Sequence, residues 1–248
     1  MLSETVFARA TKEHIIMEPF PHLVLENALP HDVFHKLLST RPHYPSSMNT
    51  SNKLLPIYAN LILSLDFYNK EWKNFIAKHT TPDIYYKMRE LFADCWPESQ
   101  PVLPKKTTRF GLFHRDSWQN GGLDVLTDAR VDISSPVYGK ASSHRKAHLD
   151  EPNRLFSALF YMRDDDDDSQ GGGLDLFSFT GEPCRPLDVF ELPDTKVKRV
   201  KTYPYKANTL VAFPQSINAI HGAQIREVTS HERTFVFITA EVEHDFLK

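Results

Sequence analysis

The chain has 248 residues, of which 41% are hydrophobic and 25% charged, and its formal net charge is −3. These values are typical of one large soluble domain, and the lack of a concentrated basic patch disfavours nucleic acid or an anionic membrane surface as a partner. The two cysteines form no metal-binding spacing, and neither a signal core nor a membrane span is evident, so a cytoplasmic location is expected.

The first 106 residues predict mainly helices. A short strand is expected within residues 21–30, followed by a helix over 31–38, and two more helices are expected over 66–79 and 81–96. The first helix has an expected apolar stripe of Val33, Phe34, Leu37 and Leu38. In the last helix we expect Thr81 as N-cap, Pro82 at the first helical position, and a buried face of Ile84, Met88, Leu91 and Cys95. The polar loop 41–53 is a candidate lid.

From residue 107 onward, short apolar segments alternate with Gly, Pro and Asp turns. They predict strands over 108–113, 130–138, 154–162, 173–179, 198–205, 208–214 and 233–242. This pattern favours an α+β, mainly β fold: a double-stranded β-helix (jelly roll, cupin-like) with the N-terminal helices packed on one sheet. We expect a single domain over 1–248, with a helical support region in 1–106 and the jelly-roll catalytic core in 107–248. The acidic run 164–168 is expected to be a solvated loop tip.

Two His-x-Asp triplets stand out as candidate metal sites. The triplet His114-Arg115-Asp116 leads into a polar loop and is read as a turn or salt bridge. In the other, His148 and Asp150 directly precede a long apolar strand, and His221 follows an apolar strand 73 positions after His148. Two imidazoles and one carboxylate are the ligand set of non-haem Fe(II) oxygenases.

Several segments with these residues occur in a fixed order: HLDEPN, LFYM, GGGLDLF, NTLVAFP, IHGA and RTFVFI. Together, over roughly residues 131–242, they resemble the Fe(II)- and 2-oxoglutarate-dependent oxygenases, in particular the prolyl-hydroxylase-like branch. The resemblance implies that His148, Asp150 and His221 are the catalytic metal ligands, with Fe(II), 2-oxoglutarate and O2 as cofactor and co-substrates.

The distal carboxylate of 2-oxoglutarate needs a buried cationic partner. Arg233, which opens an apolar strand, is assigned to it, and Arg226 is the rival. The resemblance further implies a hydrogen bond from Tyr161 to the same carboxylate, with Tyr138 as a second candidate.

The function expected from this resemblance is hydroxylation of an aliphatic C–H bond of a small molecule, with release of succinate and CO2. Two alternatives stay open: the same chemistry on a protein side chain, and a metal- or sugar-binding jelly roll without catalysis. His144 and Arg145, just before the metal motif, are further candidates to face the substrate. The sequence sets neither the substrate nor the oligomeric state.

Overall fold

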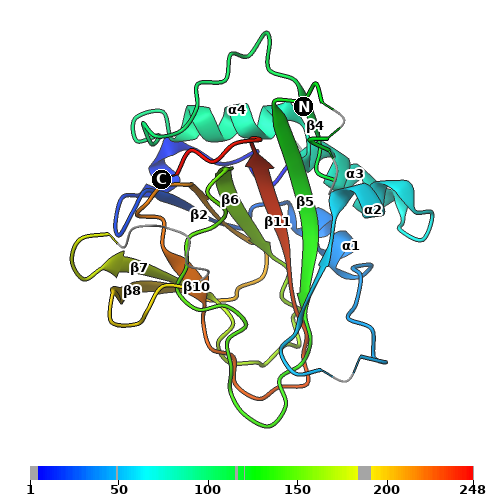
Figure 1. The fold of residues 1–248 in the computed structure, drawn as a ribbon. Coiled ribbons are helices and arrows are strands. Elements are labelled where there is room, and N and C mark those ends of the chain that lie inside the picture. The colour runs from blue at the N-terminus through cyan, green and yellow to red at the C-terminus, as the bar shows by residue number, and fades with distance from the viewer. Residues whose placement is uncertain (1–4, 49, 115–116, 120, 184–190, 248) are drawn as a thin grey trace.

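The computed structural model describes residues 5–48, 50–114, 117–119, 121–183 and 191–247 (Figure 1). Its strands form one eight-stranded sheet, in the order β1-β2-β9-β6-β11-β5-β3 with β4 beside β5, and one three-stranded sheet, in the order β10-β7-β8. The large sheet contains β1 (Ile15–Ile16), β2 (His22–Glu26), β3 (Leu54–Ile57), β4 (Phe110–Leu112), β5 (Val125–Ser134), β6 (Arg154–Tyr161), β9 (Thr209–Pro214) and β11 (Arg233–Glu241). The small sheet contains β7 (Leu174–Phe179), β8 (Val197–Tyr203) and β10 (His221–Ala223).

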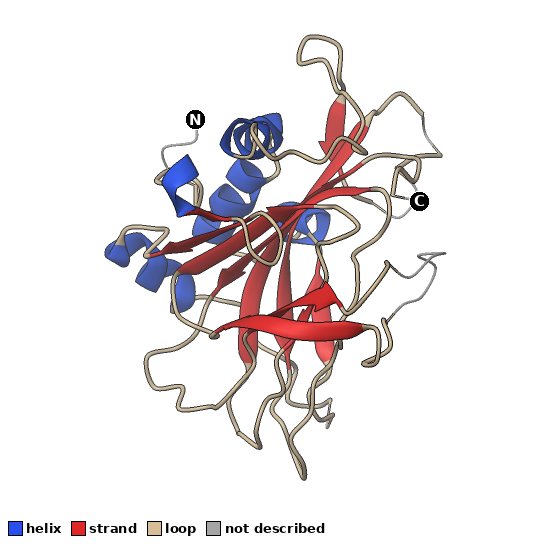
Figure 2. Ribbon diagram, turned by 90° about the vertical axis from the view of Figure 1, so that its left-hand side faces the viewer, coloured by secondary structure: helices blue, strands red, loops and turns tan. Residues whose placement is uncertain are grey.

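Helices cover one face of the large sheet, and the small sheet lies on the other side (Figure 2). The helices are η2 (Lys12–His14), α1 (His31–Leu38), α2 (Ala59–Ser64), α3 (Lys70–His79) and α4 (Pro82–Leu91). This arrangement confirms the mainly β jelly roll with N-terminal helices packed on one sheet. No helix in the described part of the chain combines the length and the apolar character needed to cross a bilayer.

The large sheet takes strands from both sides of residue 107. Strand β2 pairs with β9, and β3 pairs with β5 at the edge of the sheet, so the N-terminal region supplies part of the jelly roll as well as its helical cover. The sequence pattern predicted β2 but not β3, which contains Pro56 and therefore does not read as a strand. Strand β5 also begins at Val125, five residues before the predicted start at Arg130, and it ends at Ser134 instead of residue 138.

Some details of the predicted helices were wrong. The last helix ends at Leu91, so Cys95 lies beyond it and is only partly buried. Val33 is 40% exposed, so it does not belong to the buried stripe of α1, which is formed by Phe34, Leu37 and Leu38. Thr81 is the N-cap residue of α4, as predicted, although its hydroxyl donates to the carbonyl of Lys78 and accepts no capping hydrogen bond from the helix. Pro82 does open that helix, as predicted.

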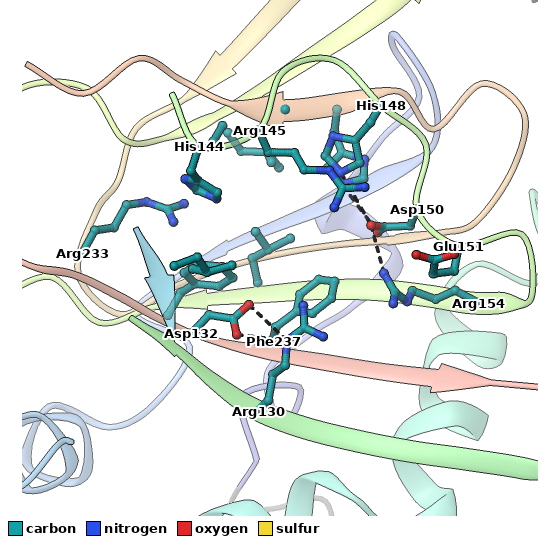
Figure 3. Close-up of a pocket in the computed structure, with 17 residues that line it drawn as sticks. Arg130, Asp132, His144, Arg145, His148, Asp150, Glu151, Arg154, Arg233 and Phe237 are labelled. Carbon is teal, nitrogen blue, oxygen red and sulfur yellow. Dashed lines mark hydrogen bonds and ion pairs between the residues drawn. The ribbon is translucent and has the colours of Figure 1, made fainter. Parts of the chain in front are cut away.

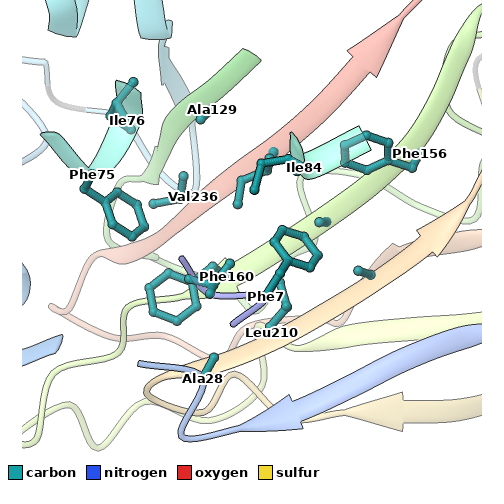
Figure 4. Close-up of a cluster of buried hydrophobic side chains, with 14 of the residues drawn as sticks. Phe7, Ala28, Phe75, Ile76, Ile84, Ala129, Phe156, Phe160, Leu210 and Val236 are labelled. Carbon is teal, nitrogen blue, oxygen red and sulfur yellow. The ribbon is translucent and has the colours of Figure 1, made fainter. Parts of the chain in front are cut away.

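Apolar side chains fill the space between the helices and the large sheet (Figure 4). Phe75 and Ile76 of α3 and Ile84 of α4 belong to the same buried cluster as Phe160 of β6 and Val236 of β11. A second cluster lies on the opposite face of these strands and joins the two sheets. Alternate residues of β6 and β11 therefore point to opposite faces, and the inner face is the one available for a site.

The acidic run joins β6 to β7, and most of it is solvated as expected, with Asp167 as the buried exception. The carboxylate of Asp164 pairs with Arg41, and that of Asp168 lies 3.4 Å from Nε2 of His231. Asp167 is only 8% exposed and accepts a hydrogen bond from the backbone of Ser169. Arg41 thus holds the start of this run against the protein, while Asp165, Asp166 and Asp168 remain exposed.

The buried imidazole of His79 predicts an acid-dependent loss of stability. Its Nδ1 donates to the carbonyl of Phe75 at 2.7 Å, and its Nε2 accepts from the backbone N–H of Val6 at 3.0 Å. Burial lowers the pKa of His79 from 6.5 to about 4. Because the unfolded chain binds a proton first, the contribution to stability is complete above pH 6.5 and is lost as the pH falls toward 4.

His79→Gln should therefore flatten the stability curve between pH 7.5 and pH 5. Glutamine stays neutral, so the variant should lose about 2 kcal/mol less over this interval than the unmodified protein does. Urea unfolding of both proteins at the two pH values, with a chelator present, measures the difference. Parallel loss of stability in both proteins would contradict this role for His79.

Candidate active site

His148, Asp150 and His221 meet between the two sheets (Figure 3). The two histidines pair as neighbours across an antiparallel bridge, in which each backbone N–H donates to the other carbonyl at 2.9 and 3.0 Å. Asp150 follows His148 by two residues, so both side chains leave the extended chain on the same side. Ligand atoms from all three residues lie within 4.8 Å of one another, and each residue is less than a tenth exposed.

Both imidazoles present Nε2 to the space between them. The Nδ1 of His148 lies 2.8 Å from the carbonyl of Lys146, and that of His221 lies 3.0 Å from the carbonyl of Ala219. Since a carbonyl oxygen can only accept, each Nδ1 carries the hydrogen and each Nε2 keeps its lone pair. Burial lowers the pKa of His221 to about 4, so this ring is neutral at pH 7.

The carboxylate of Asp150 is held from behind by two side chains. Nη1 of Arg154 lies 2.9 Å from its Oδ1, and the hydroxyl of Ser157 donates to its Oδ2. Arg154 is itself fixed by Glu241, whose Oε1 accepts from Nη2 at 2.8 Å and from Nε at 3.1 Å. Burial alone would raise the pKa of Asp150, but Arg154 and the two histidines outweigh it and hold this pKa well below the usual value.

These donors fit a divalent transition metal. Two neutral imidazole nitrogens and one ionised carboxylate on a single side leave the opposite positions open to other ligands, which is the geometry of non-haem Fe(II) sites. Each ligand also has the backbone or side-chain partner that normally orients such groups. The sequence predicted this set of three residues, and the fold brings them together.

Arg233 and Tyr161 place two polar groups near one another in an apolar setting. The guanidinium carbon of Arg233 lies 4.5 Å from the ring centre of Phe235 and 5.3 Å from that of Tyr161. Nε of Arg233 donates to the carbonyl of Gly172, but within the described residues neither its Nη1 nor the Tyr161 hydroxyl has a hydrogen-bond partner. Buried donors without an acceptor are costly, so both groups fit a carboxylate ligand.

Gly172 is required where the chain passes these arginines. Its φ is +76°, and a Cβ at this position would lie 2.9 Å from Cγ of Arg226 and 3.2 Å from Cδ of Arg233. A larger residue would therefore be strained and would displace Arg233. The glycine-rich turn after the acidic run thus helps to place the candidate co-substrate arginine.

The rival arginine, Arg226, is buried and makes structural hydrogen bonds to the backbone. Its Nη1 donates to the carbonyl of Ser135 at 3.0 Å, and its Nη2 donates to the carbonyl of His231 at 2.8 Å. Burial, followed by the charge of Arg233, lowers the pKa of Arg226 to about 10. Contacts to two backbone carbonyls indicate that Arg226 ties the loop before β11 to the end of β5.

Two other sequence candidates are not part of this arrangement. Tyr138 is 52% exposed, since β5 ends at Ser134 and the chain has left the sheet, and it does not line the cavity. We therefore withdraw it as a co-substrate ligand. Of the triplet His114-Arg115-Asp116, the last two residues lie outside the described part of the chain, and His114 lines a separate hollow beside Tyr58 and Phe113.

A cavity of about 240 Å³ contains the three candidate ligands and Arg233. His144 and Arg145 line it, as the sequence suggested, and burial lowers the pKa of His144 to about 3. Sequence reasoning missed several charged residues of the wall: Arg130, Asp132, Glu151 and Arg154. The alternation of β5 offered a signal for two of them, because Arg130 and Asp132 lie on the same face.

The region that carries the site matches a known family model. Residues 134–238 match the model described as the 2OG-Fe(II) oxygenase superfamily, a range that includes all three candidate metal ligands and Arg233. No curated protein matches the sequence.

Several solved structures are similar in arrangement. One is a prolyl-4-hydroxylase of Pseudomonas putida, at 12% identity and TM-score 0.46 over 90% of this chain and 93% of that one. Another is a prolyl hydroxylase of Trichoplax adhaerens in complex with a hypoxia-inducible-factor peptide, at 11% identity and TM-score 0.43 over 90% and 84%. A third is the α-ketoglutarate-dependent epimerase of nogalamycin biosynthesis, at 10% identity and TM-score 0.48 over 89% and 78%.

Proposed function

We propose that this chain is a 2OG-Fe(II) oxygenase that hydroxylates an aliphatic C–H bond of a small molecule, because residues 134–238, which carry the candidate site, match the model of that superfamily. The observation that carries the proposal is the convergence of His148, Asp150 and His221 in one cavity with the buried guanidinium of Arg233. A metal site and an anion site side by side are what an enzyme of this class needs for Fe(II) and 2-oxoglutarate.

Each residue has a role in this proposal. His148, Asp150 and His221 hold Fe(II), with the Nδ1 hydrogens of both histidines fixed by backbone carbonyls. Arg233 binds the distal carboxylate of 2-oxoglutarate through Nη1, and the hydroxyl of Tyr161 donates a second hydrogen bond to it. Burial raises the pKa of Tyr161, so this hydroxyl keeps its proton at neutral pH.

The protein's own contribution is to bind, orient and exclude water. Bound Fe(II), together with 2-oxoglutarate and O2, supplies the oxidation: one oxygen atom enters the substrate as a hydroxyl, and the other enters succinate as CO2 leaves. The apolar side chains Phe235 and Leu174 line the cavity near Arg233 and keep solvent from the buried charges.

The buried position of the candidate ligands supports a small substrate. All three are less than a tenth exposed, and they line a cavity of about 240 Å³ that also contains Arg233. A small molecule can enter such a space whole, whereas a protein must insert an extended side chain through the opening.

The proposal is tested with the purified protein, Fe(II) and 2-oxoglutarate. We expect visible charge-transfer absorption when both bind without oxygen, and succinate release when O2 is admitted. Small molecules that raise succinate release and gain one oxygen atom would identify the substrate class. Absence of both the absorption and the succinate would contradict the assignment of the site, and stimulation by peptides alone would contradict the preference for a small molecule.

A further inference from the structure

Arg130 lies on the inner face of β5 and lines the same cavity as Arg233 (Figure 3). In the ladder between β5 and β11, Arg233 pairs with Ser134, and Phe237 pairs with Arg130. The two arginines thus stand four residues apart along the ladder, which is about 13 Å at the usual rise of a strand. The two side chains therefore enter the cavity from different points of its wall.

The side chain of Arg130 is held in one orientation. Its Nε lies 2.9 and 3.2 Å from the two carboxylate oxygens of Asp132, which is buried. The guanidinium carbon lies 4.7 Å from the ring centre of Phe237 and 5.8 Å from that of Tyr58. A guanidinium fixed through Nε and by aromatic rings loses little freedom when it binds a ligand, so it is prepared for recognition.

The two Nη groups of Arg130 are available to bind a ligand. Among the hydrogen bonds of the described residues, Arg130 uses only its Nε, and its side chain is 22% exposed at the cavity wall. The other arginines differ, because Arg154 is bound by Asp150 and Glu241 and Arg226 is bound by backbone carbonyls. Arg145 brings a second cationic side chain to the same cavity, from the loop that precedes the metal motif.

We propose that the Nη edge of Arg130 binds a carboxylate of the prime substrate, so that the substrate is a small carboxylic acid. This inference rests on the proposed function, since it assigns the part of the cavity that 2-oxoglutarate at Arg233 leaves open. The planar fork of a guanidinium matches a carboxylate with two parallel hydrogen bonds. Asp132, Asp150 and Glu151 also line the cavity and repel a second negative charge, which favours a monoanion over a phosphate ester.

A fluorinated carboxylate tests this site without knowledge of the substrate. Trifluoroacetate is titrated against the protein loaded with Fe(II) and saturating 2-oxoglutarate, and its fluorine relaxation is measured without oxygen. We expect saturable binding of trifluoroacetate and none of trifluoroacetamide, its neutral counterpart, at the same concentrations. Saturating 2-oxoglutarate keeps the probe from the Arg233 end of the cavity.

Matched variants locate the binding. Arg130→Gln should lower the affinity for trifluoroacetate at least tenfold. Arg130→Lys keeps the positive charge but lacks the planar guanidinium, so it should lower the affinity less. Arg109→Gln removes an exposed arginine that pairs with Asp124 and should leave binding unchanged. Retained charge-transfer absorption in the Arg130 variants would show that the metal and 2-oxoglutarate sites are intact.

The inference would be overturned by three results: no saturable binding to the unmodified protein, equal binding of the amide, or unchanged binding to Arg130→Gln. Failure of the proposed function is a separate observation, because it appears as missing charge-transfer absorption with Fe(II) and 2-oxoglutarate alone. Trifluoroacetate binding to the protein without iron can still be measured in that case through line broadening.

Discussion

Asp150→Ala is expected to abolish turnover and to weaken Fe(II) binding by more than about 100-fold, since loss of an outer partner alone costs 10–100-fold. The variant removes the only anionic ligand of the proposed set. It also leaves the cation of Arg154 facing two imidazoles, which opposes the entry of a divalent ion. Titration with Fe(II) under anaerobic conditions measures the affinity, and succinate release measures the turnover.

Asp116→Ala is the matched control, because it alters the other His-x-Asp triplet. It should bind Fe(II) as the unmodified protein does and should still decarboxylate 2-oxoglutarate without a prime substrate. Thermal unfolding of both variants separates a loss of ligand from a loss of fold. Equal loss of Fe(II) binding in the two variants would show that the wrong triplet, or both, had been assigned to the metal.

Arg233→Lys should lower the affinity for 2-oxoglutarate by about tenfold or more, whereas Fe(II) binding should be retained. The arginine bonds to Gly172 through Nε and still has Nη1 for a carboxylate, whereas a lysine ammonium cannot hold the same fork geometry. The affinity is measured by titration of the Fe(II)-loaded protein with 2-oxoglutarate, followed by the charge-transfer absorption.

Arg226→Lys provides the comparison for this prediction. Because Arg226 contacts the carbonyls of Ser135 and His231, this variant should have a lower melting temperature. Its affinity for 2-oxoglutarate should fall less than that of Arg233→Lys. A larger effect on 2-oxoglutarate in Arg226→Lys than in Arg233→Lys would exchange the roles of the two arginines.

The candidate site residues could be predicted because they stand in short motifs whose order resembles a known family. His148, Asp150 and His221 lie at the ends of apolar segments, and Arg233 opens an apolar strand, but only the ordered set of motifs linked residues that are up to 85 positions apart. The jelly roll was predictable because alternation and turn residues recur along the second half of the chain.

Residues that depend on distant partners were not predictable. Arg154 lies four positions after Asp150, but its role needs Glu241, which reaches it only through the pairing of β6 with β11. Tyr138 was wrongly assigned because the predicted strand was continued through Pro136, whereas β5 ends at Ser134. Strand β3 was missed since its place beside β5 depends on tertiary pairing and not on its own residues.

The buried link from Glu241 through Arg154 to Asp150 has a consequence for how the proposed site would acquire a metal. The buried carboxylate of Asp150 would be costly if its charge had no counterpart, but here Arg154 pairs with it before any ion binds. Folding and metallation are then separate events, unlike the small zinc domains in which the ion drives folding. We expect the metal-free protein to keep its fold and to bind Fe(II) afterwards. Other divalent ions should compete for the same three ligands, so the active fraction should depend on which metal is supplied.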